Sequence, residues 1–94
     1  MKFLIYFKKN DLKKIINDAY TTFRNEKIVD IKKIDHISFL QLYHGPTLAF
    51  KDIAMQVLGQ MYNFLLKDSK KVINLISATS GDTGAAAIDA VQGK

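Results

Sequence analysis

The chain has 94 residues, 48% hydrophobic and 24% charged, a balance that excludes a disordered polypeptide and leaves room for one domain at most. It has no cysteine, which excludes disulfides and thiolate metal sites and fits a reducing compartment, so we expect a cytoplasmic protein. No apolar stretch approaches the roughly 18 residues that a membrane span needs, so no membrane partner is expected.

The net charge of +5 comes almost entirely from lysine. The lysines are scattered in pairs (13–14, 32–33 and 70–71) with acidic residues among them, and they form neither an arginine cluster nor a basic stripe interleaved with aromatic residues. This pattern favours a solvated surface and no nucleic-acid partner. A small, non-catalytic basic α/β module that binds anions or nucleic acid remains the alternative.

The first half of the chain predicts a helix followed by two strands. The apolar run 1–7 ends too soon for a signal sequence and favours a β-strand or the remnant of a longer domain. Apolar residues at helical spacing then predict an amphipathic helix over 11–24. Runs rich in β-branched and aromatic residues predict strands over 28–34 and 37–43, and the Gly45-Pro46 pair must end the second.

The second half predicts a helix, a strand, a loop and another helix. An apolar stripe begins near residue 48 and is closed by Asp68-Ser69, residues 72–76 have the pattern of a buried strand, 77–83 is a loop, and 84–91 is an alanine-rich helix. This order is typical of an α/β fold with a parallel sheet and flanking helices. The small apolar face of the last helix would pack on a sheet, yet only one strongly hydrophobic strand is present. We therefore interpret residues 1–94 as a single partial domain.

Two motifs in residues 42–94 suggest chemistry. The sequence Gly-Pro-Thr-Leu-Ala-Phe-Lys over 45–51 places Lys51 at a helix start, where the helix dipole and apolar neighbours disfavour an ammonium ion and favour a nucleophilic amine. The sequence Thr-Ser-Gly-Asp-Thr-Gly over 79–84 connects a predicted strand to a helix, where backbone N–H groups can bind an anion. A surface lysine and an ordinary capped turn are the alternatives.

Two histidines are weaker candidates. His44 precedes the glycine of the lysine motif, and His36 lies in a predicted turn. Neither has a second ligand at metal-binding spacing, so no metal site is predicted.

The segments 42–52 (Leu-Tyr-His-Gly-Pro-Thr-Leu-Ala-Phe-Lys-Asp) and 77–87 (Ser-Ala-Thr-Ser-Gly-Asp-Thr-Gly-Ala-Ala-Ala) closely resemble the threonine synthase family. That family belongs to the fold-type II, tryptophan synthase β-like enzymes that use pyridoxal 5'-phosphate. The resemblance runs from about residue 11 to 94. It implies a partial three-layer α/β architecture with an incomplete parallel sheet.

The resemblance also implies roles for individual residues. Lys51 would hold pyridoxal phosphate covalently and act as acid and base. The 79–83 loop would bind the substrate α-carboxylate, and Asp82 would also lie near the ring oxygen of the cofactor. The substrate-binding residues in that loop would be Thr79, Ser80, Gly81, Asp82 and Thr83. The implied reaction converts O-phospho-L-homoserine and water to L-threonine and phosphate.

Other expected parts of the family pattern are missing from these 94 residues. A glycine-rich loop for the cofactor phosphate should follow well downstream of the lysine, as should the group that contacts the pyridine nitrogen. We therefore expect an N-terminal-half fragment truncated at both ends and inactive on its own. It would be a degraded gene, a frameshifted frame or one part of a split enzyme, in which case a separately encoded remainder would be its partner.

Overall fold

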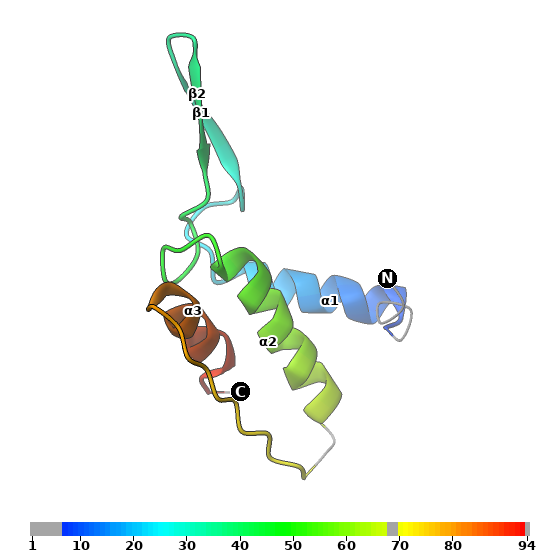
Figure 1. The fold of residues 1–94 in the computed structure, drawn as a ribbon. Coiled ribbons are helices and arrows are strands. Elements are labelled where there is room, and N and C mark those ends of the chain that lie inside the picture. The colour runs from blue at the N-terminus through cyan, green and yellow to red at the C-terminus, as the bar shows by residue number, and fades with distance from the viewer. Residues whose placement is uncertain (1–6, 68–69, 94) are drawn as a thin grey trace.

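The computed structural model describes residues 7–67 and 70–93, and these form three helices and one β-hairpin (Figure 1). The α/β fold class predicted from the sequence is confirmed. In chain order the elements are α1 (Lys9–Tyr20), β1 (Asp30–Ile34), β2 (Ile37–Gln41), α2 (Asp52–Leu66) and α3 (Asp82–Val91). The interpretation of residues 1–6 as a strand or remnant, and of Asp68-Ser69 as a helix end, lies outside the described residues.

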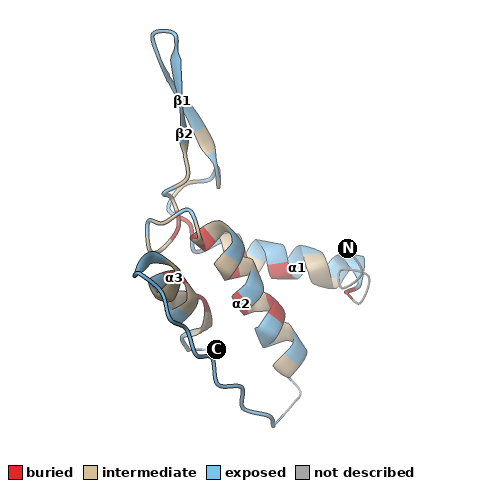
Figure 2. Ribbon diagram, viewed as in Figure 1, coloured by how far each residue is buried: buried red, intermediate tan, exposed pale blue. Residues whose placement is uncertain are grey.

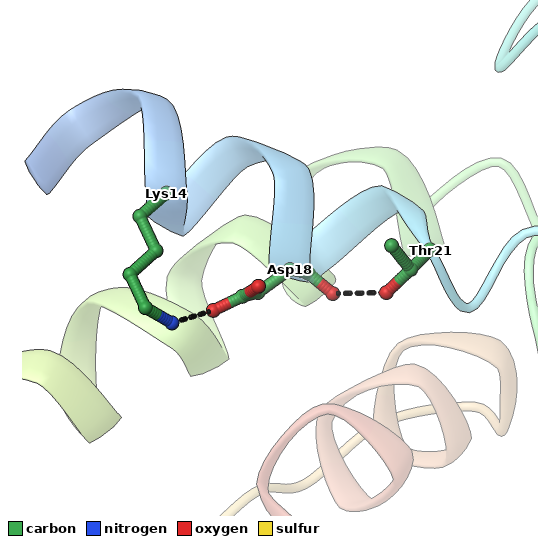
Figure 3. Close-up of polar contacts among 3 residues, drawn as sticks. All are labelled: Lys14, Asp18 and Thr21. Atoms are coloured by element: carbon green, nitrogen blue, oxygen red, sulfur yellow. Dashed lines mark hydrogen bonds and ion pairs between the residues drawn. The ribbon is translucent and has the colours of Figure 1, made fainter. Parts of the chain in front are cut away.

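Helix α1 ends earlier than predicted, at Tyr20 rather than at residue 24. The Thr21 hydroxyl donates to the carbonyl of Asp18 (Figure 3). The Thr21 N–H donates to the carbonyl of Asn17, so the last turn is closed locally. Phe23 is still buried, because its ring packs edge-on against that of Tyr20 with the centroids 5.2 Å apart. The apolar periodicity therefore continued past the true end of the helix.

Strands β1 and β2 form an antiparallel hairpin joined by the two-residue turn Asp35-His36. Asp35 has a φ of 55°, the left-handed conformation that tight hairpin turns require and that aspartate tolerates. The hairpin stands away from the helices, and nearly all of its residues are exposed (Figure 2). The two strands were predicted correctly, and each is shorter than expected.

The predicted strand at 72–76 forms no sheet in this structure. The hairpin is the only sheet in the described ranges, and residues 70–79 run as an extended, exposed segment beside α2 and α3 (Figure 1). Val72 and Ile76 are 85% and 97% exposed. A strand is stabilised by hydrogen bonds to a neighbouring strand, and no other part of the described chain supplies one.

The core lies between α1 and α2. Phe7, Ile15 and Met61 form its buried centre, with Val57 and Phe64 among the residues packed around it. The Tyr20 hydroxyl donates a 2.8 Å hydrogen bond to the carbonyl of Ile53, which ties the end of α1 to the first turn of α2.

The small residues of the last helix led us to expect that it packs on a sheet. In the structure, helix α3 packs on α2 instead. Gly59 of α2 faces the backbone of Ala90, so close that a Cβ at residue 59 would lie 2.9 Å from the Ala90 carbonyl carbon. Beside this contact, Gln56 Nε2 donates a 2.7 Å hydrogen bond to Asp89. The glycine and the alanine let the two helices approach closely, and this packing fixes where α3 begins relative to α2.

Candidate functional site

Lys51 is the last residue before α2 and is half-buried. Its Nζ lies 5.8 Å from the centre of the Phe50 ring. Within residues 7–67 and 70–93, no hydrogen bond or ion pair engages this amine. The structure therefore places Lys51 at a helix N-terminus, as predicted, with its amine over the Phe50 ring and outside any hydrogen bond or ion pair of the described residues.

The segment 45–51, which we call the lysine loop, leads into α2 without being helical. We expected the helical pattern to begin near residue 48, and this was wrong by about one turn because Leu48 has a φ of 67°. A leucine in the left-handed region is uncommon and is held there only by its surroundings. The Leu48 N–H closes a turn by donating to the carbonyl of Gly45.

Asp52 is the residue whose structural role the sequence did not reveal. Its side chain is completely buried, and both of its carboxylate oxygens accept hydrogen bonds from Thr47. Oδ2 receives the Thr47 N–H at 2.9 Å and Oδ1 receives the Thr47 hydroxyl at 2.7 Å. In the sequence it is the acidic residue that directly follows Lys51. The threonine five residues earlier is its actual partner, and this spacing is not a recognised capping pattern.

His44 is held by contacts within the fold. Its carbonyl accepts the N–H of Arg24 at 2.8 Å, its ring nitrogen Nε2 lies 3.2 Å from Gln41 Oε1, and its ring packs against that of Tyr43. His36 lies exposed in the hairpin turn, on an element that stands apart from the helices. In the part of the chain that is described, no group of three or more His, Cys, Asp or Glu residues could hold a metal ion.

The 79–83 loop leads into α3 and is largely exposed. The Thr79 hydroxyl accepts hydrogen bonds from the N–H groups of Gly81 and Gly84, at 3.1 and 2.9 Å, and so shapes the turn from inside. Gly81 has a φ of 141°, which disfavours a side chain at this position. The N–H groups of Asp82 and Thr83 belong to the first helical turn, which has no internal acceptors for them. Both donors are therefore free to face an anion.

The packing of α3 on α2 brings the two candidate motifs to one end of the helix pair. Figure 1 shows the lysine loop entering α2 and the 79–83 loop entering α3 at the same end. Two parallel helix N-termini there add their partial positive charges, which favours an anionic ligand.

A cavity in the described residues lies apart from both motifs. It has a volume of about 640 Å³ between the second half of α2 and residues 71–75, and Tyr62, Leu66 and Val72 are among its lining residues. Lys51 and the 79–83 loop do not line it. One wall of this cavity is the exposed segment that forms no sheet in the described ranges.

The lysine pairs do not form a continuous basic face. Lys32 and Lys33 are successive residues of β1, so their side chains point to opposite faces of the hairpin. On α1, Lys14 pairs with Asp18 one helical turn away (Figure 3). None of the helices in the described residues has the length and apolar character needed to cross a membrane.

Comparison with known proteins finds this arrangement within part of an enzyme. No protein-family model matches the chain. A crystal structure of pyridoxal phosphate-bound threonine synthase from Brucella melitensis superposes with a TM-score of 0.78 and 41% sequence identity, covering 89% of this chain and 18% of that chain. The segment is thus shared with an enzyme whose structure contains bound pyridoxal phosphate.

Over this segment the chain is homologous to threonine synthases. The yeast threonine synthase structure superposes with a TM-score of 0.81 and 38% identity, over 90% of this chain and 19% of that one. The curated enzyme of Schizosaccharomyces pombe is 39% identical in an alignment that covers 90% of this chain and 18% of that enzyme. That of Corynebacterium glutamicum is 44% identical in an alignment that covers 89% of this chain and 18% of that enzyme. The chain therefore spans slightly less than a fifth of the length of these relatives.

Proposed function

We propose that this chain is a threonine synthase segment that binds pyridoxal phosphate covalently through Lys51. The observation that carries the proposal is the half-buried Lys51 directly before α2, whose amine makes no hydrogen bond or ion pair in the described ranges, in a segment 41% identical to a pyridoxal phosphate-bound enzyme. The anion-binding capacity of the 79–83 loop at the same end of the helix pair supports it. These residues suit a group with one aldehyde and several anionic oxygens. Bound there, that group would supply an electron sink for chemistry at a carbon next to an amine.

The residues of this chain have separate tasks in the proposal. Lys51 Nζ carries protons to and from the α and β carbons of the substrate, which is O-phospho-L-homoserine. The 79–83 loop holds the substrate α-carboxylate through its free N–H groups and its hydroxyls, while Asp82 also lies beside the ring oxygen of the cofactor. Phosphate leaves the γ carbon of the substrate, which takes up a proton to become a methyl group, and the hydroxyl of water adds to the β carbon, giving L-threonine.

The complete activity requires groups that these 94 residues do not contain. They hold no glycine-rich loop after α3 to bind a cofactor phosphate. We therefore propose that residues 1–94 by themselves do not catalyse the reaction and supply one part of the complete site. A cytoplasmic location belongs to the same proposal.

Titration of the purified chain with pyridoxal phosphate tests the attachment. Borohydride reduction followed by peptide mass analysis locates the adduct, and the Lys51→Ala variant is the first comparison. Lys67→Ala is the matched control, because this lysine lies just after the other end of α2, with its Nζ 4.4 Å from the centre of the Phe64 ring. We expect one saturable adduct that is abolished by Lys51→Ala and unchanged by Lys67→Ala.

Diffuse labelling of many lysines that Lys51→Ala leaves unchanged would refute the proposal. Binding to polyanions that weakens steeply with added salt, without a Lys51 adduct, would support the basic binding module instead.

A further inference from the structure

Asp52 and Thr47 are joined by hydrogen bonds but have no role in the chemistry proposed above. Thr47 directly precedes the segment 48–51 and Asp52 directly follows it. Two short hydrogen bonds join Thr47 to the carboxylate of Asp52. Thr47 presents both a backbone and a side-chain donor to a single carboxylate. The lysine loop is thus closed by one side chain.

Gly45 completes the enclosure of this carboxylate. A Cβ at residue 45 would lie 2.8 Å from the carboxylate carbon of Asp52, so only glycine leaves the side chain its space. Gly45 is itself buried. The loop therefore packs around Asp52 from two sides.

The charge of Asp52 is accounted for without Lys51. A buried carboxylate is unfavourable unless hydrogen bonds satisfy it, and Thr47 provides two. As the first residue of α2, Asp52 also lies in the favourable field of the helix N-terminus. No ion pair joins it to the lysine within the described ranges. Its role is therefore not to neutralise the neighbouring amine.

We propose that Asp52 and Thr47 form a clamp that positions Lys51 for attachment of the cofactor. The clamp fixes the peptide on both sides of Leu48, whose left-handed conformation has to be held by its surroundings. It also fixes the backbone immediately after Lys51, so the lysine side chain leaves the loop from a defined point. Asp52 and Thr47 are positioning residues, because neither touches the reacting amine. This inference rests on the proposed function of Lys51.

Three variants of the chain test the clamp. Thr47→Val removes the hydroxyl donor and keeps the size of the side chain, Thr47→Ser restores the hydroxyl, and Asp52→Asn removes the carboxylate charge. Asp89→Asn is the matched control, because Asp89 accepts an equally short 2.7 Å hydrogen bond from α2, in the packing with α3. The readouts are the affinity for pyridoxal phosphate at Lys51 and the hydrogen exchange of backbone amides 47–50.

We expect Thr47→Val and Asp52→Asn to weaken the affinity at Lys51 about tenfold, because a hydrogen bond to a charged group is lost. Amide exchange in the lysine loop should accelerate in parallel. Thr47→Ser should stay within about twofold of the original chain, as should Asp89→Asn. If Asp52→Asn loses its helical circular dichroism, the comparison of Thr47→Val with Thr47→Ser decides the question.

The two proposals fail in different ways. An original chain that forms the Lys51 adduct, with Thr47→Val binding equally well, overturns the clamp and leaves the proposed function standing. An original chain without a Lys51 adduct overturns the proposed function and with it the role of the clamp. Equal weakening by Thr47→Val and Asp89→Asn overturns the clamp as well, because it indicates a general loss of stability.

Discussion

Replacing Gly59 by alanine tests the packing of α2 and α3 that brings the two motifs together. At an exposed helical position this change stabilises a helix by about 1 kcal/mol, because alanine has the higher helix propensity. At residue 59 the new methyl group would lie 2.9 Å from the carbonyl carbon of Ala90, about 0.6 Å inside an ordinary carbon–carbon contact. The obstructing atoms belong to a helix backbone and cannot rotate away.

The expected net effect follows from these two opposing terms. Overpacking of this kind costs about 1–3 kcal/mol, and a contact with backbone should lie near the upper end. After the gain in helix propensity is subtracted, a loss of about 2 kcal/mol remains. In a domain of this size such a loss lowers the thermal midpoint by roughly 10 °C. Thermal unfolding followed by far-ultraviolet circular dichroism measures it.

Asn63→Ala provides the comparison, because Asn63 is exposed on the same helix. There the new alanine should stabilise the chain by about 0.5 kcal/mol. A midpoint that rises in both variants would refute the reasoning, since it would show that α3 does not pack against residue 59 in solution.

Two further predictions concern α1. Burial raises the pKa of Tyr20 above its ordinary value of 10.0, so the stability that its hydroxyl contributes is present below pH 10 and is lost as the pH rises further. Tyr20→Phe should therefore be less stable by about 1 kcal/mol at pH 8, since the bond to Ile53 is lost, and urea titrations should show this difference shrinking above pH 10. A constant difference up to pH 11 would contradict this. Asp18→Asn breaks the exposed ion pair with Lys14 and should lower the free energy of unfolding by no more than about 0.5 kcal/mol at low salt. In 1 M salt it should have no measurable effect. A larger loss that salt does not reduce would be inconsistent with a surface ion pair.

Local sequence patterns predicted most of the elements of this chain. Each predicted helix and hairpin strand is present, because these elements depend on periodicity and turn residues within a few positions of one another. Their ends were less accurate. Thr21 closes α1 through its own hydroxyl, and the positive φ of Leu48 delays the start of α2. Neither effect changes the apolar pattern from which the boundaries were predicted.

The other features that the sequence did not predict correctly depend on contacts with residues that are distant in the sequence or on a neighbouring strand that the described chain does not provide. Residues 72–76 have the composition of a buried strand, but a strand forms only when a neighbour pairs with it. The packing of Gly59 against Ala90 joins residues about thirty positions apart, and the sequence around either residue does not predict it. For the candidate site, the sequence identified Lys51 and the 79–83 loop as candidates, while the buried state of Asp52 depends on how the preceding loop folds around it.

The hydrogen bond between the Arg24 N–H and the His44 carbonyl has a consequence for how this region can change in length. A second bond, from the Arg24 guanidinium to the carbonyl of Pro46, reinforces it at 3.4 Å. The chain leaves and re-enters the helical body at this one point, and the hairpin lies entirely between. Because the ends of the excursion are tied together, residues can be inserted at or deleted from the hairpin turn without moving the lysine loop. Lengthening such a closed loop adds little entropy cost, about 0.6 kcal/mol for each doubling. The hairpin turn is thus a place in the described ranges where an inserted tag or peptide would disturb the helices little.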